Sequence, residues 1–291
     1  ISNMNINADT DKQGLFGYTY NANIENVTVT NSFVYSYEAG SGTSNTGVIV
    51  GLARGTSITN SSVSNSAIKG QSNVGLIAGG TTNSSSIENS YVVNSTVGVG
   101  SVSVGGIAGY NDASTSTIEN VYAANISVTA GNGAAGITCG NGVTNAYVYN
   151  SVIGGGNSVA ISSSYTNGYY DEATTVGGIN GTAGVGDCRS AAWFASQNSV
   201  NALGNEFELQ SGAARPTLVH NSETGVTPYS PTTKQVSYKE EDNITATLEM
   251  LGATEIYTIN YHDTKYYLIE NKAQLQAIAT ETSAGSLSKN Y

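Results

Sequence analysis

The chain has 291 residues, of which only 11% are charged, and its 10 Lys and Arg against 21 Asp and Glu give a formal net charge of −11. Such an acidic surface repels phosphate backbones, so no nucleic-acid partner is expected. Gly, Asn, Ser or Thr interrupts every apolar run well before the roughly 18 residues of a membrane-spanning helix, so no transmembrane segment is predicted.

A glycine-closed apolar pentad recurs five times from the N-terminal end. The copies are residues 13–17, 47–51, 75–79, 105–109 and 136–140, and their closing glycines lie 34, 28, 30 and 31 residues apart. Units of this length built from Val, Ile, Thr, Asn and Gly predict an all-β fold, a parallel β-solenoid (β-helix) with coils of about 30 residues. A helical repeat would instead place Ala, Leu, Glu and Lys at three-and-four spacing.

Two asparagines five residues apart follow each pentad. The first series is Asn26, Asn60, Asn89, Asn120 and Asn145, and the second is Asn31, Asn65, Asn94, Asn125 and Asn150. Asn tolerates the left-handed backbone of a corner, and its amide can bond the Asn of the next coil. We therefore predict two structural Asn ladders, a closing-Gly ladder at a corner where a Cβ would clash, and interior ladders of Val and Ile.

Glu88 and Glu119 hold one repeat position in adjacent coils, about 5 Å apart at the backbone if the coils stack. Stacked carboxylates can serve as a catalytic pair or a calcium site in a carbohydrate-active solenoid. Thr59 and Thr144 fill the same position in other coils, and no Arg or Lys lies in register. We therefore favour the interpretation that Glu88 and Glu119 are solvated surface carboxylates over a catalytic pair or a calcium site.

Tyr91, Tyr122 and Tyr147 also share a repeat position, just before an inward apolar residue. They predict an exposed aromatic strip. Such a strip could lie along a glycan, since each ring presents apolar area and a hydroxyl. Ordinary packing of β-forming residues along a ladder is the alternative, and we favour it.

No catalytic set emerges from the sequence. The only histidines, His220 and His262, are far apart and outside any zinc-binding helix motif, and two cysteines cannot complete a tetrahedral zinc site. Cys139 occupies the pentad position that Ala78 and Ala108 hold in earlier copies, which suits a small buried thiol. Two free thiols are therefore favoured over a disulfide bridge between Cys139 and Cys188. We expect no enzyme activity, no metal and no cofactor.

The repeat register is lost after about residue 155. The stretch with Trp193, Phe194, Leu203, Phe207, Leu209 and Leu218 is predicted to cap the last coil. Prolines at 216, 228 and 231 place a domain boundary near 228–231, dividing a solenoid with its cap (1–228) from a small α+β unit or the start of a next module (229–291). That unit is expected to hold a hairpin over 256–269 and a helix opening near Asn271 and Gln274.

The core Gly14-Leu15-Phe16-Gly17 matches the glycine-leucine-x-glycine centre of the GLUG motif, which the later pentads vary. Over about residues 1–220 the chain resembles the GLUG-motif repeat regions of large bacterial surface or secreted proteins. These include adhesin-like proteins, filamentous-haemagglutinin-type exoproteins and the non-catalytic region of immunoglobulin-A-cleaving metallopeptidases.

This resemblance implies a non-catalytic structural or binding segment of a secreted or cell-surface adhesin-like protein. Its partners would be a host glycan or protein, or neighbouring modules of the same chain. A glycan-binding or glycan-cleaving solenoid is the alternative function. Residues 1–7 look like the segment before a first pentad, and residues 268–279 resemble the opening of a further module, so we expect a piece of a longer chain.

Overall fold

The computed structural model describes residues 1–36, 44–99, 102–112, 114–177, 186–224, 226, 233–237, 243–251, 254–261, 264–268 and 273–274. The chain divides into two compact units. The repeat unit comprises Ile1–Arg189, Leu203–Phe207 and Leu218–Ser222, and the C-terminal unit comprises Ser190–Ala202, Glu208–Thr217 and Glu223–Tyr291.

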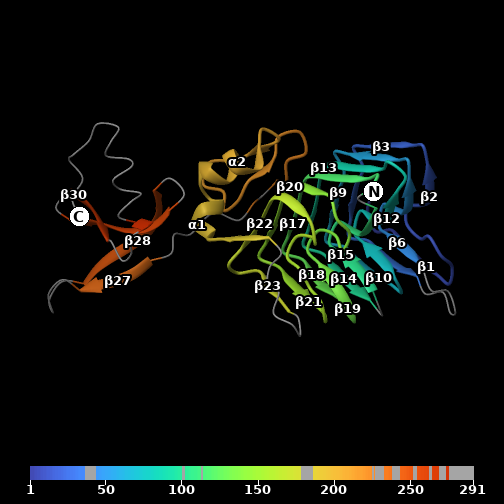
Figure 1. The fold of residues 1–291 in the computed structure, drawn as a ribbon, viewed down its shortest axis with the longest axis horizontal. Helices are drawn as coiled ribbons and strands as arrows, with labels where there is room; N and C mark the ends of the chain where they lie inside the picture. The colour runs from blue at the N-terminus through green and yellow to red at the C-terminus, as the bar shows by residue number, and fades with distance from the viewer. Residues whose placement is uncertain are drawn as a thin grey trace. The chain divides into compact units, whose positions relative to one another are not determined.

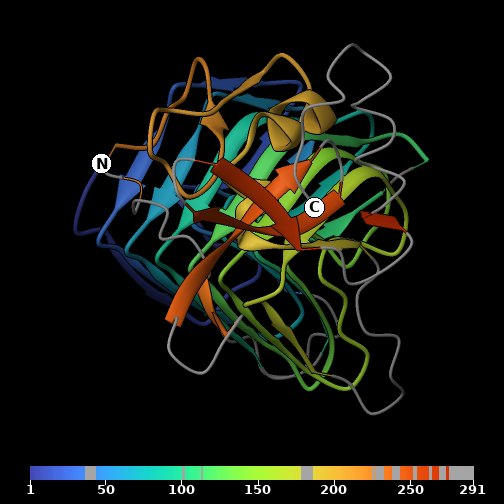
Figure 2. The same ribbon diagram turned by 90° about the vertical axis from the view of Figure 1, so that its left-hand side faces the viewer.

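Four sheets build the repeat unit, and consecutive repeats contribute neighbouring strands (Figures 1 and 2). The seven-stranded sheet is ordered β1 (Asn5–Ala8), β5 (Phe33–Ser36), β10 (Ala67–Gly70), β14 (Thr96–Val99), β18 (Ser127–Thr129), β21 (Val152–Gly154), β23 (Thr175–Val176). One four-stranded sheet is ordered β19 (Asn132–Ala135), β15 (Val102–Gly105), β11 (Asn73–Gly75), β6 (Asn45–Gly47), and the other is ordered β16 (Ala108–Asn111), β12 (Ala78–Thr82), β7 (Val50–Arg54), β2 (Phe16–Tyr20).

The nine-stranded sheet carries the Asn-containing block of each repeat. Its main order is β24 (Asp187–Arg189), β22 (Tyr165–Asp171), β20 (Val143–Tyr149), β17 (Thr117–Ala124), β13 (Ser86–Val93), β8 (Ser57–Thr59), β3 (Asn23–Glu25). Beside β13, the short strands β9 (Ser62–Ser64) and β4 (Thr28–Thr30) continue the pairing.

Neighbouring repeats pair in parallel and in the register that the sequence predicts. Ile87 is the register partner of Ile118, which is in turn the partner of Val143. In the seven-stranded sheet Ile68 lies between Val34 and Val97. The prediction of a β-rich fold with parallel sheets is therefore confirmed.

Aliphatic side chains from equivalent positions form the core. Ile58, Ile87 and Ile118 are fully buried, as are the pentad residues Ile49 and Ile77. Because parallel pairing sets equivalent residues about 4.8 Å apart, each row of β-branched side chains packs continuously from repeat to repeat. One apolar cluster consequently runs through all five repeats.

The closing glycines of the pentads allow two strands to approach closely. A Cβ added at Gly79 would collide with the backbone nitrogen of Thr46, and one at Gly109 would collide with that of Val74. Neither glycine has a positive φ, so the requirement is steric contact with the neighbouring backbone. This confirms the predicted clash and gives its physical origin.

The C-terminal unit contains an antiparallel sheet of β27 (Thr233–Ser237), β28 (Asn243–Leu251), β29 (Thr254–Tyr261) and β30 (Thr264–Leu268). The predicted hairpin is confirmed, because β29 and β30 pair antiparallel with Ile259 opposite Tyr266. Its turn and the expected domain boundary at 228–231 lie outside the described residues. Of the helix expected to begin near Asn271, only residues 273–274 are described, and both are helical.

Two short helices, α1 (Ala191–Phe194) and α2 (Gln197–Leu203), follow the last strand of the repeat unit. Within the C-terminal unit, the Ser190 hydroxyl caps α1 by accepting from the Trp193 backbone N–H, and the Trp193 and Phe194 rings meet edge to face. The strands β25 (Phe207–Glu208) and β26 (Thr217–Leu218) form a separate two-stranded sheet.

Candidate functional site

Glu88 on β13 and Glu119 on β17 are register partners in the nine-stranded sheet, as predicted. Thr59 and Thr144 continue the row on either side. Within the described parts of the chain, no three His, Cys, Asp or Glu side chains group closely enough to hold a metal ion. Calcium takes six to eight oxygen ligands, so these two carboxylates by themselves do not complete its coordination.

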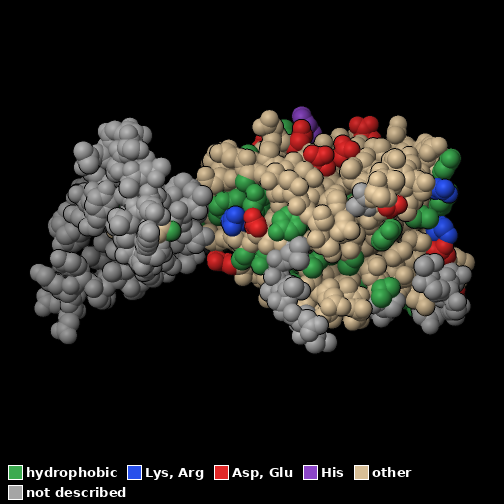
Figure 3. All heavy atoms as spheres, viewed as in Figure 1, with side chains coloured by type: hydrophobic (Ala, Val, Ile, Leu, Met, Phe, Trp, Pro, Cys, Tyr) green, Lys and Arg blue, Asp and Glu red, His purple; other side chains and the backbone are tan. Residues whose placement is uncertain are grey.

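Carboxylates are dispersed over the face of the molecule shown in Figure 3. On the face shown in Figure 3, the Asp and Glu side chains lie singly or in small groups among uncharged atoms, with few Lys or Arg beside them. This distribution agrees with the formal charge of −11 and presents no concentrated cationic patch on that face.

Tyr91, Tyr122 and Tyr147 form the aromatic row that the sequence predicts. The ring centroids of Tyr91 and Tyr122 are 4.9 Å apart and those of Tyr122 and Tyr147 are 5.0 Å apart, with 2° between the ring planes in both cases. Tyr169 on β22 continues the row in register. The centroid spacing equals the separation of paired strands, so the strand pairing sets the stack.

The tyrosine row is covered by a later segment of the same unit, so the expectation of an exposed strip is wrong for Tyr122 and Tyr147. Both side chains are 0% exposed. The Phe207 ring lies 6.0 Å from that of Tyr147 and is tilted by 54°. The Asn221 amide donates to the carbonyl oxygens of Asn89 at 2.9 Å and Ser61 at 3.3 Å.

We call Leu203–Phe207 together with Leu218–Ser222 the strap. The sequence expectation placed its residues Leu203, Phe207 and Leu218 in an end cap. Their apolar character was the visible signal, but they lie outside the repeat register, so the sequence did not connect them with the tyrosines. The strap makes the tyrosine row a packing surface within this chain.

All ten ladder asparagines adopt the left-handed backbone conformation, with φ between 46° and 58°. Amide bonds join Asn125 to Asn94 at 3.1 Å and Asn150 to Asn125 at 2.8 Å. The amide chain is interrupted in the first series, where the Oδ1 atoms of Asn60 and Asn89 are buried without a hydrogen-bond partner. The backbone conformation is therefore the common property of the two ladders.

A serine row completes these corners, and the sequence analysis missed it. Ser61 donates its backbone N–H to the Ser90 hydroxyl at 3.0 Å, and Ser66 donates to that of Ser95 at 3.1 Å. The Ser90 hydroxyl in turn donates to the Glu88 carbonyl at 2.7 Å. Because the left-handed Asn turns the chain, the next N–H needs a side-chain acceptor. The recurring Asn-Ser dipeptide was the available signal.

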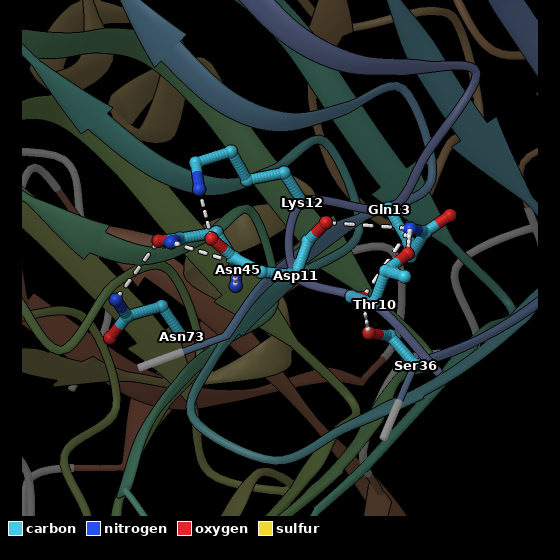
Figure 4. A network of polar contacts seen from close by, with 7 residues as sticks. All are labelled: Thr10, Asp11, Lys12, Gln13, Ser36, Asn45 and Asn73. Atoms are coloured by element: carbon cyan, nitrogen blue, oxygen red, sulfur yellow. Dashed lines mark hydrogen bonds and ion pairs between the residues drawn. The ribbon is translucent and has the colours of Figure 1, made fainter. Parts of the chain in front are cut away.

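A second polar network lies beside β6 (Figure 4). One Asp11 carboxylate oxygen accepts from the Asn45 backbone N–H at 3.0 Å, and Asn45 Oδ1 accepts from the Asn73 amide at 3.0 Å. Burial acts to raise the pKa of Asp11, but hydrogen bonds from Lys12 and Asn45 outweigh it and hold the pKa below its ordinary value. Asp11 is thus a structural hydrogen-bond acceptor at the end of a row that continues through the side-chain amides of Asn45 and Asn73.

Cys139 and Cys188 are separate free thiols. The Cys139 Sγ lies 2.9 Å from the Gly133 carbonyl oxygen and 3.2 Å from that of Val104, and burial raises its pKa to about 11. A thiol in this state is a poor nucleophile at neutral pH. Cys188 is exposed.

The structure thus places the two glutamates side by side in one row and the three tyrosines side by side in another, as the sequence predicts. His220 is exposed, and His262 lies outside the described residues. Among the described residues, no helix has the length and apolar character needed to cross a membrane. Comparison of the chain with protein-family models and with curated proteins finds no match.

Proposed function

We propose that the repeats form a parallel β-solenoid of the GLUG type that serves as a non-catalytic structural and binding segment of a secreted or cell-surface bacterial protein of the adhesin kind. The observation that carries the proposal is the unbroken register of parallel pairing from β3 through β22. Such an arrangement makes a rigid body that lengthens one repeat at a time.

The corners support this architecture. Left-handed asparagines, serine acceptors and closing glycines each recur with the repeat, so every coil turns at the same places. Side chains on the outer faces are then free to vary without disturbing the core. A spacer or presenting segment needs this separation of an invariant interior from a variable exterior.

The proposed partners are a host glycan or protein, or neighbouring modules of the same polypeptide. The buried parts of the tyrosine row are unavailable to them, because Tyr122 and Tyr147 are fully buried and the strap residue Phe207 packs against Tyr147. Binding of the purified chain to a glycan array and to immobilised host-cell surface proteins tests the proposal. Saturable binding that competes with the soluble ligand supports it, and absence of binding to both contradicts the host-binding role.

A carbohydrate-cleaving solenoid is the second candidate, favoured by the adjacency of Glu88 and Glu119 in register. A polysaccharide degradation screen with the parent chain and the Glu88→Gln and Glu119→Gln variants decides between the two. Turnover that disappears in either variant would replace the non-catalytic proposal. The matched control is Glu25→Gln, which alters a carboxylate of the same sheet whose register partner is Thr59.

A further inference from the structure

The described part of the chain contains three Asn-Gly steps, at residues 132–133, 141–142 and 167–168, and a fourth at 180–181 lies outside it. Asparagine is thermolabile, and at such a step it can modify itself. The nitrogen of the glycine attacks the side-chain carbonyl carbon of the asparagine, so a succinimide ring forms and ammonia leaves. Water then opens the ring on one side or the other and leaves aspartate or isoaspartate. Glycine favours the attack because it has no Cβ to crowd its nitrogen.

Two of the three described steps are held by the strands. Asn167 lies within β22, where its amide donates to Asn145 at 2.9 Å and the following Gly168 is buried. Asn132 begins β19, and its Oδ1 accepts a 2.7 Å hydrogen bond from the amide of Asn157. Ring closure must turn the asparagine side chain toward the next backbone nitrogen, which breaks these amide bonds. The fold therefore protects both asparagines.

The third step lies between strands. Asn141 is exposed in the bend that follows the fifth pentad, and Gly142 after it has φ = 76° and precedes β20. Among contacts between described residues, the Asn141 side chain makes no hydrogen bond, and only its backbone carbonyl is held, by the Asn111 amide at 2.5 Å. Its side chain can therefore turn toward the Gly142 nitrogen without breaking a hydrogen bond.

We propose that Asn141 is a site of spontaneous succinimide deamidation in the folded chain, and that the reaction loosens the join between the fourth and fifth repeats. The Asn141 carbonyl accepts from Asn111, whose side chain is buried, and the Gly142 carbonyl accepts from the Ile118 N–H at 3.2 Å. Isoaspartate adds a methylene to the main chain at this bend and moves the Asn141 carbonyl out of it as a carboxylate. Both hydrogen bonds between the repeats are thereby displaced.

Peptide mapping of the 291-residue chain after incubation at mildly alkaline pH measures the reaction at each asparagine, and labelling by an isoaspartyl methyltransferase identifies isoaspartate. Residues 131–133 and 140–142 have the same sequence, Gly-Asn-Gly, so Asn132 is the matched control. Asn141 should react at least about fivefold faster than Asn132 in the folded chain, because Asn132 must first lose a hydrogen bond. In urea, which removes the fold, the two should react at similar rates.

Asn157→Ala removes the amide bond that holds Asn132. It should bring the rate at Asn132 toward that at Asn141 and leave the rate at Asn141 unchanged. Faster reaction at Asn132 or Asn167 than at Asn141 in the native chain would overturn the proposal. So would a native Asn141 that persists under an incubation that converts it in urea.

Hydrogen exchange tests the structural consequence separately. The Ile118 amide should lose protection in the incubated parent chain, because its acceptor is the Gly142 carbonyl. Asn141→Gln, incubated in the same way, should keep that protection, since glutamine would have to close a larger ring. Unchanged Ile118 protection in parent chain that carries isoaspartate at position 141 would refute the effect on the join between repeats.

Discussion

At the residue scale, the asparagine corners depend on a backbone conformation that most residues avoid. A left-handed φ costs an ordinary L-residue roughly 1–2 kcal/mol, and Asn lowers this cost through local hydrogen bonding. Asn125 has φ = 53° and also takes part in two amide bonds along its ladder. Substitutions at this position separate the two contributions.

We expect Asn125→Ala to lower the free energy of unfolding by about 2 kcal/mol. Asn125→Gly should cost less, because Gly accepts positive φ although it also removes the amide. Asn157→Ala is the control, since Asn157 donates a 2.7 Å amide bond to Asn132 without a positive φ. Urea denaturation measures all three, and equal losses for Ala and Gly at position 125 would assign the stability to the amides.

The two thiols should differ sharply in reactivity. Burial raises the pKa of Cys139 to about 11 from 9.0, so it remains protonated at neutral pH, while Cys188 is exposed. Alkylation of the native chain without reductant should label Cys188 first and Cys139 only after unfolding, as peptide mass spectrometry will show. Since the unfolded thiol ionises at lower pH, this group lowers stability as pH rises from about 9 to 11. Failure to label either thiol after unfolding would indicate a disulfide.

At the element scale, the strap packs on the tyrosine row, whose members Tyr122 and Tyr147 are fully buried. Phe207 contacts Tyr147, and Asn221 bridges carbonyls that belong to two different repeats. The strap therefore ties several repeats together, whereas each strand pairing joins only two. Replacing a buried tyrosine of the row beneath the strap with a small residue should therefore lower the free energy of unfolding.

Tyr122→Ser tests this burial. Removing a fully buried aromatic ring typically costs about 3–5 kcal/mol, because contacts are lost and a cavity remains. Tyr110→Ser, at a partly exposed tyrosine on β16, should stay within about 0.5 kcal/mol of the parent chain. Chemical denaturation of both variants gives the comparison. Similar small losses would mean that the strap does not close over the row in solution.

At the scale of the whole molecule, stability is transmitted between repeats through shared ladders. Ile118 packs in register between Ile87 and Val143, so each repeat depends on its neighbours for a complete core. In such a stack the folding of one repeat is coupled mainly to the repeats beside it. A destabilising substitution should therefore weaken the altered repeat and its immediate neighbours before the more distant repeats.

Ile118→Asp should cost several kcal/mol, because it buries an unpaired charge against apolar neighbours in two repeats. Hydrogen exchange should show protection lost first in β13, β17 and β20. Val152→Asp, at a valine 55% exposed on β21, serves as the control and should have little effect. Uniform loss of protection over all the sheets would instead indicate a single cooperative core without repeat-by-repeat coupling.

The sequence by itself determined the features that recur. Spacing alone placed Ile87 beside Ile118 and Asn94 beside Asn125, because a repeated unit with parallel pairing carries every residue to the same place in the next repeat. The left-handed corners followed from the chemistry of Asn, and the closing glycines from their lack of a side chain. These are local properties, and five copies make them visible.

Only the tertiary structure decided which outward row is covered. Nothing in the pattern around Tyr122 and Tyr147 distinguishes an exposed strip from a buried one, since burial depends on the path of a strap that lies outside the repeat. The partners of the serine hydroxyls and of Asp11 likewise depend on how one repeat lies against the next. Periodicity encodes contacts between equivalent residues, whereas a contact with a non-repeating segment is set by the three-dimensional course of the chain.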